Sequence, residues 1–353
     1  MTALTPRPGP ALSNDAMLPM PRTDRITRLP VLILFPHSRC NCRCLMCDIW
    51  KASDRDEITV EEVTRWVGEW RALNVERVVL SGGEALLHRA LWPLCDVLRE
   101  AGIGITILST GLLLARHAQE LVRRCDDVVV SLDGPPDIHD AVRNVPRAFE
   151  RLAEGVQAVR AANPSVMITA RCTVQRANHH ALRDTVRTAR DMGVDRISFL
   201  AADTSSSAFN RPGGWEPDRI GEVAVREEEL EMLAAELDAL ERECHDDFAS
   251  GFIAESPLKL HRRLLRHFSA HHGVGDFHPN QCNAPWVSAV IEADGTVKPC
   301  FFQPALGNLR SAPSLSAILN SDDAVAWRGG LDIERNEICR RCVCTLSLAE
   351  GPH

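Results

Sequence analysis

Short apolar runs alternate with amphipathic stretches between residues 31 and 200, and this alternation limits the possible folds more than any other feature of the chain. The runs predict six strands, at 31–35, 77–80, 104–108, 128–132, 166–173 and 196–200. The stretches between them predict helices at 60–73, 90–101, 112–124, 148–161 and 181–192. Each predicted helix is long enough to connect two parallel strands, so the pattern indicates a parallel sheet.

The number of repeats decides between a closed and an open barrel. Six β–α units are too few for the closed eight-stranded barrel, so we predict an α/β fold with a partial (β/α)6 TIM-like barrel. Such folds carry their chemistry at the carboxyl ends of the strands. Reactive side chains are therefore expected just after each predicted strand.

Changes in composition divide the chain into four parts. Turn-forming residues after Leu200 end the alternation, and Asp294-Gly295 lies between two apolar runs, which predicts a hairpin. The predicted parts are a Pro-rich and flexible arm at 1–30, the partial barrel at 31–202, a linker and helical segment at 203–281, and a small cysteine-rich α+β domain at 282–353.

Charge and hydropathy exclude some partners. The net charge of -8 and the pI of 5.9 disfavour nucleic acid, which is bound largely by clustered cations. No apolar run reaches the ~18 residues of a membrane span, and no secretory signal is visible, so we expect a cytoplasmic protein. In that reducing compartment, the 13 cysteines indicate metal binding or catalysis more than disulfides.

Four cysteines follow the first predicted strand in the sequence Cys40-Asn-Cys-Arg-Cys44-Leu-Met-Cys47. Thiolates of Cys40, Cys44 and Cys47 would hold a 4Fe-4S cluster by three ligands and leave one iron open. A fourth cysteine, Cys42, interrupts this spacing. A structural zinc knuckle is the alternative, but zinc sites usually use pairs of cysteines two residues apart, and this run offers one such pair.

This CxxxCxxC loop after the first strand resembles the motif of the radical S-adenosylmethionine (radical SAM) superfamily. The resemblance implies that Cys40, Cys44 and Cys47 hold a 4Fe-4S cluster whose open iron binds the amino and carboxylate groups of S-adenosyl-L-methionine. Cys42 falls at a spacer position of this motif, so we interpret it as a non-ligand. It also implies an electron donor such as flavodoxin or ferredoxin.

Further residues at strand ends match the same superfamily. Gly82-Gly83-Glu84 resembles its GGE motif, which implies that Glu84 contacts the methionine amino group. By the same resemblance, Ser109, and Ser131 with Asp133, face the methionine carboxylate and the ribose. Arg171 on the fifth strand could pair with a carboxylate, although a surface arginine fits equally well. The predicted cofactor-binding residues are thus Gly82, Gly83, Glu84, Ser109, Ser131, Asp133 and Arg171.

Five more cysteines lie near the carboxyl terminus. Their opening spacing resembles the SPASM domain, and their later departure from that series resembles its shortened form, the twitch domain. The resemblance implies an auxiliary 4Fe-4S cluster on Cys282, Cys300, Cys339 and Cys342, with structural zinc as the alternative. Cys344 is left over, and we interpret it first as idle, with ligation in place of Cys342 or hydrogen donation to a substrate radical as alternatives.

Together these features predict a radical SAM oxidoreductase. It would cleave S-adenosyl-L-methionine to a 5'-deoxyadenosyl radical, abstract hydrogen from a substrate and pass an electron to the auxiliary cluster. A small-molecule substrate is favoured over a peptide, because the arm of 30 residues is too short for a leader-binding module. Radical epimerisation and modification of a ribosomal peptide remain alternatives, and the non-enzymatic alternative is an iron-sulfur or zinc redox sensor.

Overall fold

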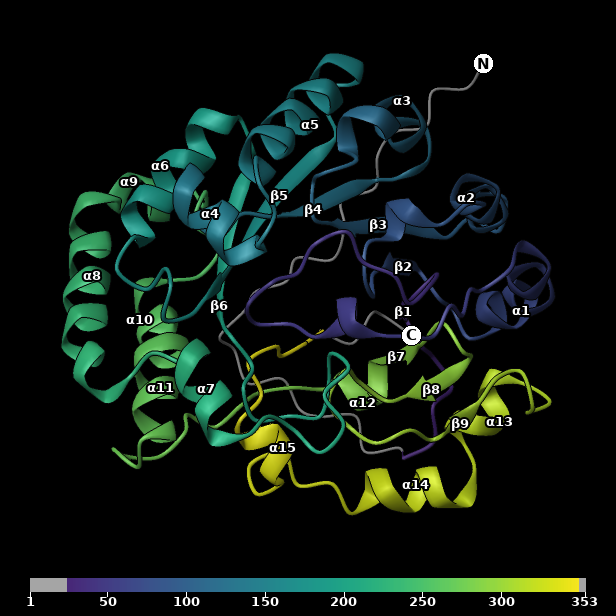
Figure 1. Ribbon diagram of the computed structural model, residues 1–353. Coiled ribbons are helices and arrows are strands. Elements are labelled where there is room, and N and C mark those ends of the chain that lie inside the picture. The colour runs from purple at the N-terminus through teal and green to yellow at the C-terminus, as the bar shows by residue number, and fades with distance from the viewer. Residues whose placement is uncertain (1–23, 349–353) are drawn as a thin grey trace.

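One continuous sheet of nine strands organises the computed structural model, which describes residues 24–348 (Figure 1). The strand order is β6-β5-β4-β3-β2-β1-β7-β8-β9. Pairs from β6 through β7 are parallel, whereas β8 pairs antiparallel with both β7 and β9. The strands are β1 Val31–Leu34, β2 Arg77–Leu80, β3 Gly104–Ser109, β4 Asp127–Ser131, β5 Met167–Val174, β6 Arg196–Ala201, β7 Ser288–Ile291, β8 Thr296–Lys298 and β9 Gly307–Asn308.

Helices connect the parallel strands and cover the outer face of the curved sheet (Figure 1). The barrel helices are α1 Val60–Ala72, α2 Leu91–Glu100, α3 Leu114–Arg124, α4 Pro136–Arg143, α5 Ala148–Ala162 and α6 Leu182–Met192. The later helices are α7 Pro217–Val223, α8 Leu230–Glu243, α9 His245–Ala249, α10 Pro257–Leu260, α11 Arg266–His271, α12 Ala284–Val287, α13 Leu315–Leu319, α14 Asp322–Gly329 and α15 Glu337–Arg340. The predicted α/β partial barrel is confirmed, and α4 is an additional helix that the apolar periodicity did not indicate.

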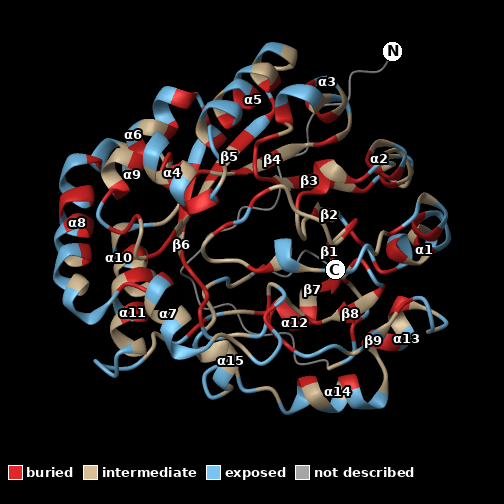
Figure 2. Ribbon diagram, in the orientation of Figure 1, coloured by how far each residue is buried: buried red, intermediate tan, exposed pale blue. Residues whose placement is uncertain are grey.

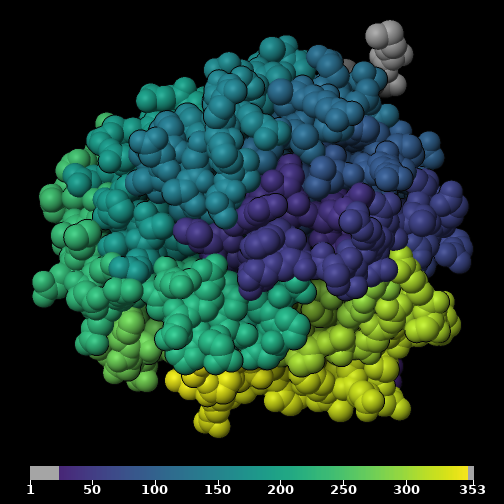
Figure 3. All heavy atoms as spheres, in the orientation of Figure 1, coloured from purple at the N-terminus to yellow at the C-terminus, as the bar shows by residue number. Residues whose placement is uncertain are grey.

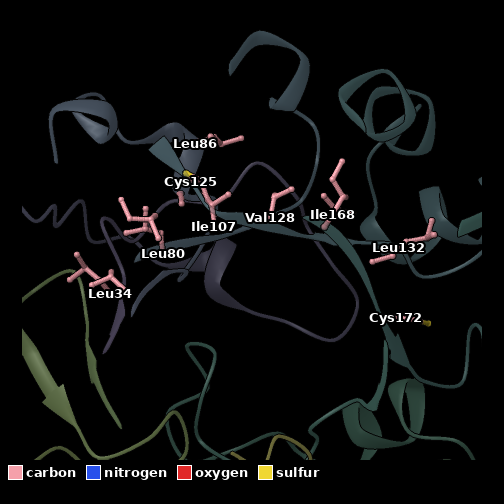
Figure 4. Packing of buried hydrophobic residues seen from close by; sticks show 14 of the residues in the cluster. Leu34, Leu80, Leu86, Ile107, Cys125, Val128, Leu132, Ile168 and Cys172 are labelled. Carbon is pink, nitrogen blue, oxygen red and sulfur yellow. The ribbon is translucent and has the colours of Figure 1, made fainter. Parts of the chain in front are cut away.

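The main core lies between the sheet and its helices. Alternate residues of each strand point into it, including Leu34, Leu80, Ile107, Val128 and Ile168 from five neighbouring strands (Figure 4). Each of these side chains is fully buried, which stabilises the fold by roughly 1.5–3 kcal/mol per residue. Buried residues accordingly line the sheet side of the helices, and exposed residues lie on their outer side (Figure 2).

The carboxyl-terminal region continues the barrel sheet. The predicted hairpin around Asp294-Gly295 is present as β7 and β8, and β7 also pairs in parallel with β1. On the inner face, Val31, Ile33, Val290 and Leu348 form a second, smaller apolar cluster. The carboxyl-terminal segment therefore shares both a sheet and a core with the barrel.

The amino-terminal part of the described chain is also packed. Ile26 and Leu29 are buried in the main core. The backbone nitrogen of Ile26 donates a 2.7 Å hydrogen bond to Oδ1 of Asn320, and that of Leu29 donates one of 2.7 Å to the carbonyl of Leu73. Residues 24–30 of the predicted flexible arm are thus fixed because their apolar side chains can be buried, while residues 1–23 lie outside the described residues. Within 24–348, no helix is long and apolar enough to cross a membrane.

Candidate functional site

The cysteine loop leaves the carboxyl end of β1 and lies across the middle of the molecule. In the space-filling view its part of the chain, coloured purple, lies between the teal barrel and the green and yellow carboxyl-terminal region (Figure 3). Cys42 and Cys44 are buried, whereas Cys40 and Cys47 are half-buried. The four cysteines pack in one small cluster with Met46, Leu112, Val145 and Ala148. This packing gathers the four cysteine side chains at the strand end where the chemistry was predicted.

The Gly82-Gly83 pair lets the cysteine loop approach β2 closely. A Cβ atom on Gly83 would lie 1.9 Å from the carbonyl oxygen of Arg39, and one on Gly82 would lie 2.9 Å from Cγ of Phe35. The backbone nitrogen of Glu84 donates a 2.9 Å hydrogen bond to the same Arg39 carbonyl. The glycines are therefore needed for contact with the loop that carries Cys40, which is a role that sequence reasoning did not identify.

The carboxylate of Glu84 is fully buried and accepts hydrogen bonds from the end of β3. Its Oε2 atom accepts from the backbone nitrogen of Thr110 at 2.6 Å and from Oγ1 of Thr110 at 2.7 Å. Oε1 accepts from Oγ of Ser109 at 3.0 Å and from the nitrogen of Leu86 at 3.2 Å. Burial raises the pKa of Glu84, and these hydrogen bonds oppose the rise. Glu84 and Ser109, both predicted site residues, are thus in direct contact with each other.

Asn41 connects the cysteine loop to the hydrogen bonds around Glu84, and its amide nitrogen is left without a partner among the described residues. Its Oδ1 atom lies 3.0 Å from Oγ1 of Thr110, which shares its single hydroxyl proton between Asn41 and Glu84. Its Nδ2 atom is buried and has no hydrogen-bond partner in the described part of the chain. An unpaired buried donor on the cysteine loop fits a bound group that accepts hydrogen bonds, such as the carboxylate of S-adenosyl-L-methionine.

Asp133 lies behind the cysteine loop and pairs with Arg143. Oδ2 of Asp133 lies 2.5 Å from Nη2 of Arg143, and Oδ1 accepts a 2.9 Å hydrogen bond from the nitrogen of Thr173. Burial raises the pKa of Asp133, and the charge of Arg143 opposes the rise. The carboxylate of Asp133, which was predicted to face the ribose, is therefore paired with protein groups in the structure. Arg143 also reaches Cys44.

Three polar residues form a row across the inner face of the barrel. Ser131 on β4 is the register partner of Arg171 on β5, which is the register partner of Ser198 on β6. Nε of Arg171 donates a 3.3 Å hydrogen bond to Oγ of Ser198. The structure therefore places the predicted residues Ser131 and Arg171 side by side. It also adds Ser198, which only the strand pairing identifies.

A segment after β6 covers the other end of the cysteine loop. Nε1 of Trp215 donates a 2.7 Å hydrogen bond to Oδ2 of Asp48, and the nitrogen of Asp48 donates one of 3.2 Å to the carbonyl of Phe209. The guanidinium of Arg211 is 0% exposed, pairs with Asp203 and lies 4.4 Å from the ring centroid of Trp215. No local pattern in the sequence predicts these contacts, because they join residues far apart in the chain.

The four predicted auxiliary ligands gather around α15 and the loop after β8. Gln303 Nε2 donates a 3.2 Å hydrogen bond to Sγ of Cys339, and Asn280 Nδ2 donates to the carbonyls of Cys339 and Cys342 at 2.6 and 3.0 Å. One backbone and two side-chain hydrogen bonds join Asn283 to Leu346 and Leu348, and they keep Cys282 beside this segment. Cys344 is exposed, and its carbonyl accepts a 3.1 Å hydrogen bond from Sγ of Cys342.

Thiol pKa values reflect this crowding. Burial raises the pKa of Cys40 and of Cys47 to about 12, and the neighbouring Cys44 adds to both rises. Burial likewise raises the pKa of Cys300 to about 12, with Cys282 and Cys339 adding to it. Interaction with the Cys42 thiol, together with the Arg143 charge, lowers the pKa of Cys44 to about 6 against the effect of burial. A metal bound at these thiols must therefore displace several protons.

The donor set suits iron and sulfur chemistry. Soft thiolates favour iron-sulfur clusters or zinc over hard cations. Among residues 24–348, no three His, Cys, Asp or Glu side chains converge closely enough to hold one metal ion. The assignment of Cys40, Cys44 and Cys47 to one site, and of Cys282, Cys300, Cys339 and Cys342 to another, stays a prediction from spacing, packing and donor chemistry.

Comparison with known families matches both cysteine regions. Residues 34–189 match the radical SAM superfamily model, and residues 282–343 match the SPASM model of an iron-sulfur cluster-binding domain. The AdoMet-dependent heme synthase of Methanosarcina barkeri is 28% identical over 175 residues, which are 48% of this chain and 50% of that protein. The GTP 3',8-cyclase of Bradyrhizobium diazoefficiens is 29% identical over 214 residues, which are 57% of this chain and 60% of that protein. The matched region thus spans 50–60% of the length of these two relatives.

Solved structures share the fold over more of the chain. SuiB of Streptococcus suis bound to S-adenosylmethionine superposes with a TM-score of 0.64 and 14% identity, covering 91% of this chain and 74% of that one. The protein anSMEcpe, with bound AdoMet and the Cp18Cys peptide, superposes with a TM-score of 0.64 and 16% identity, covering 91% and 93%. These likenesses concern the fold.

Proposed function

Because this chain belongs to the radical SAM superfamily and carries a SPASM iron-sulfur domain, we propose that it is an enzyme that reductively cleaves S-adenosyl-L-methionine to start a radical reaction. The observation that carries the proposal is the cysteine loop at the end of β1, which contacts both the Gly82-Gly83-Glu84 turn and the end of β3. A 4Fe-4S cluster on Cys40, Cys44 and Cys47 would supply the electron that splits the sulfonium into methionine and a 5'-deoxyadenosyl radical.

The residues around the loop bind and orient the ligand in this proposal. Asn41 offers its free Nδ2 donor to the methionine carboxylate. Glu84 holds Ser109 and Thr110 against the loop, so that the ends of β2 and β3 form one rigid wall. Ser131 and Arg171 line the inner face, where the remainder of the ligand and the substrate are expected.

The carboxyl-terminal cysteines have an electron-transfer role in the proposal. Four thiolates from Cys282, Cys300, Cys339 and Cys342 would saturate an auxiliary 4Fe-4S cluster, which leaves no iron for a substrate to ligate. The hydrogen bond from Gln303 to Cys339 would stabilise negative charge at that site. Oxidation of the substrate radical would then deliver one electron to this cluster. An oxidoreductase is the reaction class that this arrangement favours.

We propose a small molecule as the substrate. The two sequence relatives are named for heme synthesis and for cyclisation of GTP, and both names describe small-molecule chemistry. A peptide substrate is the second candidate, because SuiB and anSMEcpe share the fold and were solved with peptides bound. Adding the small-molecule and the peptide fractions of a cell extract separately, and measuring which one accelerates 5'-deoxyadenosine formation, distinguishes the two candidates.

The central test is anaerobic cluster reconstitution followed by reduction in the presence of S-adenosyl-L-methionine. We expect 5'-deoxyadenosine and methionine as products, measured by chromatography. Replacing Cys40, Cys44 or Cys47 by Ala should abolish the reaction, because each change removes one of three thiolate ligands. An intact, reduced cluster that yields no 5'-deoxyadenosine would refute the enzymatic proposal.

Cys42→Ala is the matched control for these variants. Cys42 lies in the same loop and is buried like Cys44, but at a spacer position. This variant should keep its iron and most of its activity. If it loses iron as the other three do, the ligand assignment is wrong. Zinc in place of iron would instead support the structural alternative, since zinc has no redox chemistry.

A further inference from the structure

A buried arginine lies directly against one of the predicted cluster cysteines. Nη1 of Arg143 donates a hydrogen bond to Sγ of Cys44 across 3.5 Å. Nη2 of the same guanidinium lies 2.5 Å from Oδ2 of Asp133. The side chain of Arg143 is 7% exposed and that of Asp133 is 0% exposed, so solvent screens these charges weakly. The guanidinium thus bridges a carboxylate and a sulfur atom.

Backbone contacts hold both ends of this bridge in place. Arg143 is the last residue of α4, and its carbonyl accepts a 3.1 Å hydrogen bond from the nitrogen of Arg43. The carbonyl of Val142 accepts one of 3.0 Å from the nitrogen of Leu45. These two bonds flank Cys44 in the chain. Because Asp133 is fixed to β5 through the nitrogen of Thr173, the guanidinium cannot swing away from the sulfur without breaking an ion pair.

A purely structural ion pair explains this arrangement poorly. Burying an ion pair stabilises a fold little, because desolvation offsets much of the attraction. Nε of Arg143 has no hydrogen-bond partner among the described residues, and one Nη atom points at sulfur, which is a weak acceptor when it is neutral. A thiolate bound to metal accepts a charged hydrogen bond much better. The geometry therefore fits a negatively charged sulfur at Cys44.

We infer that Arg143 is a positioning residue for the amino-terminal cluster, which fixes Cys44 and makes addition of an electron to this site more favourable. The inference rests on the proposed function, in which Cys44 is a cluster ligand. Reduction adds one electron from a low-potential one-electron donor and makes the site more negative by one charge. The permanently charged guanidinium stabilises that charge, and no proton has to move. The negative charge of Asp133, which pairs with the other nitrogen of the guanidinium, should make addition of the electron less favourable, by a smaller amount.

The test is the midpoint potential of the cluster in the full-length, reconstituted protein. Dithionite titration followed by electron paramagnetic resonance measures it, and the signal that changes on adding S-adenosyl-L-methionine identifies the amino-terminal cluster. Arg143→Gln should make the reduced state at least tenfold less favoured, which is a fall of about 59 mV for one electron. Asp133→Asn should shift the potential upward. Opposite shifts from the two partners are a signature that a structural role would not produce.

Two further variants keep the test decisive. Arg147→Gln is the matched control, because Arg147 is exposed, pairs with Glu150 and should leave the potential unchanged. If Arg143→Gln fails to bind iron because Asp133 is left unpaired, the double variant Asp133→Asn/Arg143→Gln removes both charges. Its potential should lie below that of Asp133→Asn.

The outcomes separate the inference from the proposed function. An iron-loaded Arg143→Gln or double variant with the wild-type potential would overturn the inference. So would loss of iron from both variants while Arg147→Gln retains it, since the role would then be structural alone. A wild-type protein that takes up no iron-sulfur cluster would instead refute the proposed function.

Discussion

Glu84 shows how one buried carboxylate can organise a site. Its two oxygens accept hydrogen bonds from four donor groups, which belong to Ser109, Thr110 and Leu86. Glu84→Gln replaces one acceptor with an NH2 group that faces donors. We expect the free protein to lose about 1–3 kcal/mol of unfolding free energy, measured by urea denaturation. Binding of S-adenosyl-L-methionine should weaken as a consequence.

Ser109→Ala is the matched control for this prediction. It removes one hydrogen bond to Glu84 and leaves the carboxylate intact, so its loss of stability should be smaller. Unchanged stability of Glu84→Gln together with weaker ligand binding would contradict the positioning role. That result would instead support direct contact between Glu84 and the ligand ammonium, as the sequence motif implies.

His139 makes the protein sensitive to acid. Its ring is buried, and Nδ1 accepts a 3.2 Å hydrogen bond from the nitrogen of Asp133. Burial, with the nearby charge of Arg143, lowers the pKa of His139 to about 3. Between the unfolded pKa of 6.5 and this value, only the unfolded chain takes up the proton, so stability falls as the pH falls.

His139→Asn should remove this contribution while keeping an acceptor for Asp133. Between pH 7 and pH 5 the wild-type protein should lose about 2 kcal/mol more unfolding free energy than the variant, at 1.36 kcal/mol per unit. Urea unfolding at the two pH values measures the difference. Equal losses in both proteins would show that the imidazole is not the group responsible.

At the scale of elements, the contact between the β2 turn and the cysteine loop permits only glycine. In Gly83→Ala the new methyl group would lie 1.9 Å from the carbonyl oxygen of Arg39. Rotating a side chain cannot relieve this clash, because the oxygen is a backbone atom and the methyl group is bonded directly to the backbone. We expect a loss of about 3 kcal/mol in unfolding free energy and poor iron uptake. Thermal unfolding and iron analysis measure these effects.

Gly68→Ala provides the comparison within another element. Gly68 lies inside α1, and a Cβ atom there would have no other atom within 4 Å. Alanine should therefore raise stability by up to about 1 kcal/mol, because it favours the helix. Similar effects of the two substitutions would mean that the close approach at Gly83 is not what requires glycine.

Local elements were predictable from the sequence, and contacts between distant segments were not. The six barrel strands and five of their helices followed from apolar periodicity, which reflects burial on one face. Helix α4 was not predicted, because it is short and has Pro136 as its first residue after Pro135. Pairing of β7 with β1 could not be foreseen, since no local pattern specifies which strand covers an edge. The cysteine spacing indicated the site, whereas the contacts of Arg143 with Cys44 and of Arg211 with Asp203 emerged only from the fold.

At the scale of the whole molecule, the two cysteine regions have separate supports. The loop at Cys40 rests on β2, β3 and α4, whereas Cys339 and Cys342 lie at α15. The variant Cys339→Ala/Cys342→Ala should therefore lose the iron of one cluster and still form 5'-deoxyadenosine. Conversion of substrate to an oxidised product should fail, because the electron has no acceptor. Iron analysis and product chromatography test both statements.

Cys344→Ala is the control for that double variant. Cys344 is exposed, and its backbone carbonyl accepts the hydrogen bond from Cys342, so removing its side chain should leave both iron content and oxidation unchanged. Loss of product with unchanged iron would point to hydrogen donation by this thiol, and hence to epimerisation. Deuterium uptake from solvent into a product of unchanged oxidation level would contradict the oxidoreductase assignment.

The central place of β1 in the sheet has a consequence for biosynthesis. One edge of β1 pairs with β2, which follows closely in the chain. Its other edge stays unpaired until β7 has been synthesised. At roughly 5–20 residues per second, a ribosome needs on the order of 10–50 s to travel from Val31 to Ser288. During that interval the nascent barrel exposes an unpaired strand beside its cysteine loop. Chaperones that shield strand edges, and the timing of cluster delivery, should therefore matter more for the yield of this protein than the folding of its carboxyl-terminal region alone.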